Sequence, residues 1–146
     1  MLPIGHLIKN EYAEQRDPRT GAKLHRLTTG PSTNHSLFFL NPSFRPPSPF
    51  TSTEVAYVTT RDGDPQICLF DFATKSARVL TDVAGLMPFS PAFDPEGKHL
   101  YYTTANGRIG HVDIDTGRQE IVATTGGGQL GECGLSRDGS FIVTAS

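Results

Sequence analysis

The sequence has no tryptophan, only two cysteines and no long apolar run. Two cysteines are too few for the disulfide framework of a small secreted protein, so Cys68 and Cys133 are expected to be buried free thiols. No apolar run approaches the roughly 20 residues that span a bilayer, which predicts no membrane partner. The N-terminus lacks the long apolar segment of a signal peptide, and a cytoplasmic location is therefore expected.

The chain also has no large net charge, because it contains 13 Lys and Arg residues and 15 Asp and Glu residues. This balance leaves no electrostatic footprint for nucleic acid, so no nucleic-acid partner is expected. Spacings such as HxH, HxxxH and CxxC do not occur, and no metal site is expected in this chain. A Gly-x-Ser-x-Gly elbow, a phosphate loop and a carboxylate pair are missing too, which leaves the catalytic residues unknown.

Turn residues are plentiful, with 15 Gly and 11 Pro, and they separate short β-like segments. The stretch 89–122 reads as four such segments joined by three turns. The sequence DPEG at 94–97 predicts a turn, and Asn106-Gly107 is the strongest short hairpin signal. Between them, residues 99–104 are rich in Tyr and Thr, which suit a pleated surface. Four antiparallel strands in about 35 residues predict one blade of a β-propeller.

The same unit recurs along the chain. The sequence DIDTG at 113–117 is echoed about 42 residues earlier by DFATK at 71–75, and again by DPRTG at 17–21. Each of these turns leads into a predicted fourth strand. A repeat of about 42 residues with four strands lies in the propeller range, and the density of Gly, Pro, Thr and Val argues against helices.

The predicted fold class is therefore all-β, an incomplete β-propeller of four-stranded antiparallel blades with about two full blades plus two half blades. An N-terminal extension at 1–9 precedes a half blade at 10–29, blades at 30–82 and 83–125, and a half blade at 126–146. In the first full blade the inner strand is expected at 37–44, followed by an insertion at 46–52.

A propeller needs four to eight blades, so we expect the chain to be the N-terminal piece of a longer protein. The alternative is that copies of the chain self-associate through their open blade edges and close a ring together.

Propeller connectivity gathers the loops between strands two and three, and between strands four and one, on one face. Three candidate substrate-binding residues fall on that face: His35, Arg61 and Arg108. The two arginines occupy similar positions in consecutive blades, and their planar forks suit a carboxylate. The plainer interpretation is that both are solvated turn charges and that His35 packs within a turn. His99 and His111 are expected to be strand residues with no ligand partner nearby.

The sequence DPRTGAKLHRLT at 17–28, followed by NHSLFF at 34–39 and NPSF at 41–44, resembles the start of the oligogalacturonate lyases. The resemblance covers about 17–146, the N-terminal part of a seven-bladed propeller. It implies a cytoplasmic enzyme of pectin degradation that cleaves short galacturonides by β-elimination, with an oligogalacturonide-like small carbohydrate as its partner. The sequence RPPSP at 45–49 departs from the family, where a Pro-Asp-Gly turn would be usual.

Such chemistry needs a base for the proton α to the uronate carboxylate and a cation that neutralises this carboxylate. In the family the base is a His assisted by an Arg, and a manganese-type divalent metal is held by His and Gln. The resemblance places these motifs beyond Ser146, so no cofactor is expected in this chain and the chain alone should be inactive. Only His35 carries over, as a channel-facing residue near the substrate.

Two alternatives remain open at this point. The first is a non-catalytic propeller that serves as a binding or scaffold module. The second is the propeller domain of a prolyl-oligopeptidase-like hydrolase, which would need a downstream α/β-hydrolase domain with its Ser elbow.

Overall fold

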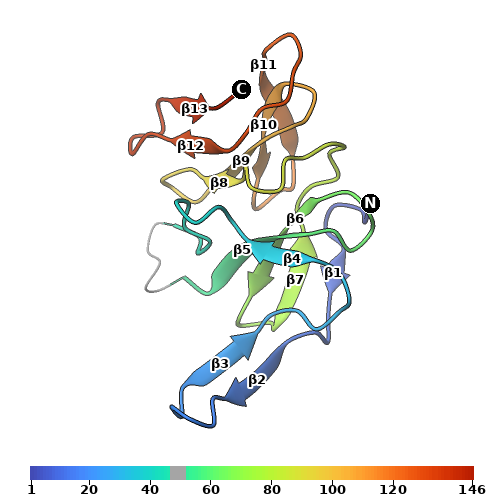
Figure 1. Cartoon of the computed structure of the whole chain (residues 1–146), viewed down its shortest axis with the longest axis vertical. Helices are drawn as coiled ribbons and strands as arrows, with labels where there is room; N and C mark the ends of the chain where they lie inside the picture. Colours follow the sequence, from blue (N-terminus) through green and yellow to red (C-terminus); the bar gives the residue numbers. More distant parts are fainter. Residues whose placement is uncertain (47–51) are drawn as a thin grey trace.

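The computed structural model describes residues 1–46 and 52–146, and every regular element in that part of the chain is a strand (Figure 1). The strands are β1 (Leu7–Ile8), β2 (Ala13–Arg16), β3 (Lys23–Arg26), β4 (Asn34–Ser36), β5 (Glu54–Thr59), β6 (Gln66–Asp71), β7 (Ser76–Val79), β8 (Ala92–Phe93), β9 (His99–Thr103), β10 (Arg108–Asp113), β11 (Gln119–Thr124), β12 (Cys133–Leu135) and β13 (Ile142–Thr144). Within the described residues, no helix is long and apolar enough to cross a membrane.

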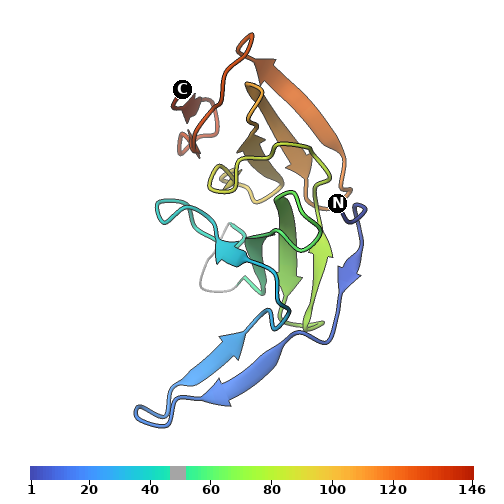
Figure 2. The same ribbon diagram turned by 45° about the vertical axis from the view of Figure 1, so that its right-hand side comes forward.

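The strands form four antiparallel sheets, in which every pairing joins strands consecutive in sequence except that of β1 with β7. The first full sheet, blade 1, has the order β1-β7-β6-β5-β4, and the second, blade 2, has the order β11-β10-β9-β8. The hairpins β2-β3 and β12-β13 form the other two sheets. Figure 2 shows the four sheets following one another along an open arc. This arrangement confirms the predicted all-β, incomplete propeller.

Blade 1 is buried on both faces, which explains the nearly continuous apolar runs of β5 and β6. Side chains alternate between the two faces of a strand. Ile67 and Leu69 therefore point toward blade 2, whereas Cys68 and Phe70 point toward the side of the β2-β3 hairpin. On that second side, Tyr12 of the N-terminal segment stacks on Phe70, with ring centroids 5.6 Å apart.

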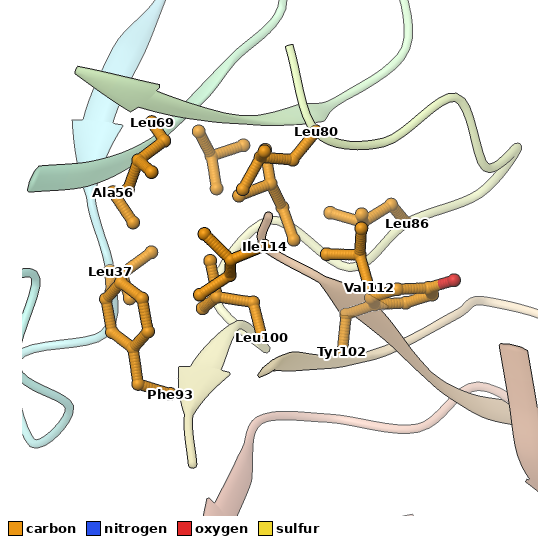
Figure 3. Packing of buried hydrophobic residues seen from close by; sticks show 12 residues of the cluster. Leu37, Ala56, Leu69, Leu80, Leu86, Phe93, Leu100, Tyr102, Val112 and Ile114 are labelled. Atoms are coloured by element: carbon orange, nitrogen blue, oxygen red, sulfur yellow. The ribbon is translucent and has the colours of Figure 1, made fainter. Parts of the chain in front are cut away.

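One apolar layer joins blade 1 to blade 2 (Figure 3). Leu100, Val112 and Ile114 of blade 2 are fully buried in it. The buried members of the layer are Leu37, Ala56, Val58, Ile67, Leu69, Leu80, Leu86, Phe93, Leu100, Tyr102, Val112 and Ile114. Each large aliphatic side chain buried in this way contributes about 1.5–3 kcal/mol, so the layer is the main source of cohesion between the blades.

The expected inner strand at 37–44 is wrong. Strand β4 ends at Ser36, and the following residues form a loop in which the Asn41 N–H donates to the Phe38 carbonyl over 2.7 Å. Pro42 comes next and has no N–H with which to continue a ladder. The chain therefore leaves the sheet along the aromatic run and rejoins β5 at the end of the expected strand, where the Ala56 N–H donates to the Ser43 carbonyl over 2.8 Å and Phe44 bridges to Val55.

The N-terminal residues, expected as an extension at 1–9, contribute a strand to blade 1. Leu7 lies opposite Arg78, and β1 thereby becomes the outermost strand of the sheet. The side chain of Gln66 also accepts a hydrogen bond from the Leu2 N–H and donates one to the Leu2 carbonyl, each over 2.8 Å. These contacts fix the first residues of the chain against blade 1.

Arg45 connects blade 1 to blade 2 through three polar contacts. Its Nε donates to the Gly97 carbonyl of blade 2 over 2.6 Å. Its two terminal nitrogens bind Glu54 of blade 1 at 2.8 Å and Asp115 of blade 2 at 3.0 Å. Residues 47–51 of the expected insertion lie outside the described residues.

Truncation of the shared layer should destabilise the whole molecule. We expect Leu100→Ala to lower the free energy of unfolding by about 3 kcal/mol, because it removes a fully buried side chain and leaves a cavity. Val143, which is 70 % exposed, provides the control, and Val143→Ala should change stability by less than about 0.5 kcal/mol. Urea denaturation measures both. Equal effects of the two substitutions would contradict the packing described here.

The thiols give a second prediction. Cys68 and Cys133 are free and buried, as expected from the sequence, and burial raises the pKa of each thiol to about 12. Because the thiolate is the reactive form, both thiols should resist Ellman's reagent in native protein and react once urea unfolds it. Rapid modification of either cysteine without denaturant would show that its burial is wrong.

Candidate functional site

The loops predicted to share one face lie together in pairs. Three backbone hydrogen bonds join neighbouring loops, from Thr60 to Thr33, from Ala105 to Gly85 and from Thr125 to Gly107. Their lengths are 3.0, 2.8 and 2.9 Å, respectively. The first bond lies within blade 1, the third lies within blade 2, and the second joins the loop between the blades to blade 2, so the loops of this face are paired within their own blades.

His35 lies on β4, the innermost strand of blade 1, opposite Val58 of β5. Its Nδ1 is 2.9 Å from the Ser36 carbonyl oxygen. A carbonyl can only accept, so Nδ1 carries the proton in this contact and the neutral ring keeps a lone pair on Nε2. The imidazole is therefore oriented with a hydrogen-bond acceptor free for a ligand.

The ring of Phe89 packs beside this imidazole. Its ring centroid lies 4.6 Å from that of His35, with an angle of 31° between the planes, and the side chain is 50 % exposed. An exposed aromatic ring next to a hydrogen-bonding imidazole suits a ligand with one apolar face and several polar groups. Phe89 was not predicted as a site residue, because in the sequence it marks only the start of blade 2.

Arg61 is already engaged by the protein. Its guanidinium forms an ion pair with Glu11, and the two side chains are 27 % and 14 % exposed. A carboxylate partner was expected for Arg61, but here the chain itself supplies it from 50 positions away. Glu11 carries no local sequence signal, because only the fold brings the N-terminal segment to this loop.

Arg108 is exposed at the start of β10, after the hairpin turn. Its backbone N–H donates to the Thr104 hydroxyl over 3.1 Å, which anchors the backbone at the start of β10. Its guanidinium makes no ion pair with residues 1–46 or 52–146. No hydrogen bond or ion pair joins His35, Arg61 and Arg108, which lie on β4, in the β5-β6 turn and at the start of β10, respectively.

His99 and His111 lie together on β9 and β10, contrary to the expectation that each lacks a partner. Their rings stack with centroids 4.6 Å apart and planes 11° from parallel. His99 Nδ1 is 2.8 Å from an Asp94 carboxylate oxygen, and His111 Nε2 is 3.5 Å from Glu120. Strand register, which the sequence does not reveal, creates this pair. Even so, no group of three or more His, Cys, Asp or Glu among the described residues could hold a metal ion.

The Arg61–Glu11 contact can be measured directly. We expect a double-mutant cycle with Arg61→Gln and Glu11→Gln to give a coupling of about 1–2 kcal/mol, because each single change leaves a half-buried charge unpaired. Thermal or urea unfolding of the four proteins provides the values. A coupling near zero would show that Arg61 is free to bind a substrate carboxylate.

No family model and no curated protein matches this chain. Among solved structures, an oligogalacturonate lyase in complex with manganese is similar over 94 % of this chain and 36 % of its own, with 23 % identity and a TM-score of 0.81. The oligogalacturonate lyase from Vibrio parahaemolyticus is similar over 96 % of this chain and 36 % of its own, with 19 % identity and a TM-score of 0.83. TolB from Acinetobacter baumannii is similar over 88 % of this chain and 30 % of its own, with 20 % identity and a TM-score of 0.61. The chain thus spans about a third of each lyase chain and has the fold of that part.

Proposed function

We propose that this chain is the N-terminal part of an oligogalacturonate-lyase-like enzyme that cleaves short galacturonides by β-elimination. The observation that carries the proposal is the likeness to two lyase structures over 94 % and 96 % of the chain, with TM-scores of 0.81 and 0.83. The sequence NHSLFF at 34–39, which resembles the start of that family, supports it independently. The proposed location is the cytoplasm.

Within this enzyme, His35 and Phe89 bind and orient the sugar. The lone pair on His35 Nε2 accepts a hydrogen bond from a sugar hydroxyl, while the exposed Phe89 ring contacts the apolar face of the sugar ring. Arg108 is the better candidate for the uronate carboxylate, because Arg61 is occupied by Glu11.

A manganese ion is present in one of the similar lyases. The described residues of this chain offer no group of three or more His, Cys, Asp or Glu that fits such an ion. The proposal therefore places the metal ligands, and the base that takes the proton α to the carboxylate, outside these 146 residues. The part played by this chain is then to bind the substrate.

A non-catalytic binding propeller is the second candidate. It is favoured by the exposed Phe89 ring beside His35, a pair that can bind a ligand without any catalytic group. The likeness to two lyases at TM-scores of 0.81 and 0.83 makes it the weaker candidate.

Titration with digalacturonate, followed by NMR, tests the proposal. We expect the ring signals of His35 and Phe89 to shift, and His35→Ala to weaken binding about tenfold through loss of one hydrogen bond and one ring contact. His6 is exposed and lies outside the site, so His6→Ala is the matched control.

The ultraviolet absorbance of the unsaturated product provides the second readout, and the chain alone should form none. Ring signals of His35 that stay unmoved by saturating digalacturonate would overturn the binding role. Product formed by the chain alone would instead show that the base lies within it.

A further inference from the structure

A cavity of about 730 Å³ opens on blade 1 at the side of β1 and the β6-β7 turn. The lining extends from β1 to Glu54 at the start of β5, whereas His35 on β4 lies opposite Val58, near the other end of β5. We propose that the cavity binds a small organic anion through phosphate or carboxylate groups. This inference does not rest on the function proposed above.

Charge is the first argument. Three basic side chains line the cavity, Lys9, Lys75 and Arg78, against the two carboxylates of Glu54 and Asp71. Only the Glu54 charge is compensated by a cation, so the negative charge of Asp71 faces the three basic side chains. Glu54 binds Arg45 at 2.8 Å, and an Asp71 carboxylate oxygen accepts the Ala73 N–H over 2.9 Å.

Two of the three cations remain uncompensated. The third cation, Lys75, has its Nζ 3.8 Å from a Glu14 carboxylate oxygen and 5.1 Å from the centre of the Tyr12 ring. Lys9 and Arg78, in contrast, form no ion pair with any residue of the described ranges 1–46 and 52–146. Two uncompensated cations facing one cavity attract an anion, and the planar fork of an arginine suits phosphate and carboxylate alike.

The backbone provides an independent argument. Among the described residues, Asn10 and Lys75 are the two non-glycine residues with positive φ, at 62° and 53°. Both line the cavity. In the repeat, Lys75 occupies the position that Gly117 holds in blade 2 with a φ of 73°. The turn between β6 and β7 thus requires a left-handed residue, and this conformation holds the Lys75 backbone at the cavity rim.

The remaining lining defines the kind of ligand. Asn10, Thr74 and Ser76 provide neutral hydrogen-bonding groups, and the exposed side chain of Leu7 provides apolar surface. The volume of about 730 Å³ lies within the range of small-molecule sites, about 300–1,000 Å³, and far exceeds a single inorganic phosphate. A small organic molecule with acidic groups fits both the size and the charge.

Calorimetric and NMR titrations of the full chain test this inference, with pyrophosphate and citrate as the two anionic probes and maltose as the neutral one. We expect at least one anion to bind, with amide shifts centred on Asn10, Lys75 and Ser76, and maltose to leave them unmoved. Pyrophosphate against citrate distinguishes phosphate from carboxylate recognition. The His35 signals should stay in place, which separates this site from the proposed substrate site.

A charge-matched pair of variants decides whether the cavity is responsible. Lys9→Gln combined with Arg78→Gln should weaken anion binding about tenfold or more. Lys98→Gln combined with Arg118→Gln removes the same charge at side chains that are 65 % and 77 % exposed and lie outside the cavity, and it should leave binding unchanged. Thermal unfolding checks both proteins, and Lys9→Gln alone serves if the Arg78 change unfolds the chain.

Two results would overturn the inference. The first is that neither anion binds. The second is an equal loss of binding in the two double variants, which would mean that general surface charge, and not this cavity, attracts the anion.

Discussion

The apolar layer between blade 1 and blade 2 is the contact on which the rest of the structure depends. A single four-stranded blade with two apolar faces cannot bury either face by itself, so neighbouring blades must stack. Ile67 and Leu69 of β6 meet this requirement on one side, where they pack in the same layer as Leu100 and Val112. The opposite face of blade 1 is closed by the N-terminal segment and the β2-β3 side, where Tyr12 stacks on Phe70.

Stacking also determines where chemistry can occur. His35 on β4 lies opposite Val58, whereas the cavity beside β1 reaches β5 only at Glu54, its first residue, so the two sites lie at different ends of the strands of one sheet. The loops of one face pair within each blade, because the blades are repeats of one unit. Arg45 also fixes the relative position of the blades, because it binds Glu54 of blade 1 and Asp115 of blade 2.

Local signals made the fold class and the blade pattern predictable. The Asn106-Gly107 hairpin appears as expected between β9 and β10, with Gly107 at a φ of 76°. Alternating and continuous apolar segments identified the central strands, because burial there depends on period-two geometry. The inner strand of blade 1 was mispredicted, because the turn from Phe38 to Asn41 and the following Pro42 outweigh the β propensity of the aromatic run.

The candidate site was predictable only in part. The pairing of neighbouring loops followed from connectivity, but His35, expected in the loop before the inner strand, lies within β4. The partners of the predicted residues could not be found, because Glu11 reaches Arg61 across 50 positions and Phe89 reaches His35 from the next blade. Likewise, the stacking of His99 on His111 depends on the register of β9 against β10. Contacts of this kind are properties of the packed sheets and leave no trace in short sequence patterns.

Native-state hydrogen exchange in low concentrations of denaturant tests the central claim most directly, that the two full blades share one core. If they do, the slowest amides of β6 in blade 1 and of β9 in blade 2 should converge on one free energy of opening, with the same dependence on denaturant. Distinct opening free energies for the two blades that stay apart up to the unfolding transition would contradict a shared core.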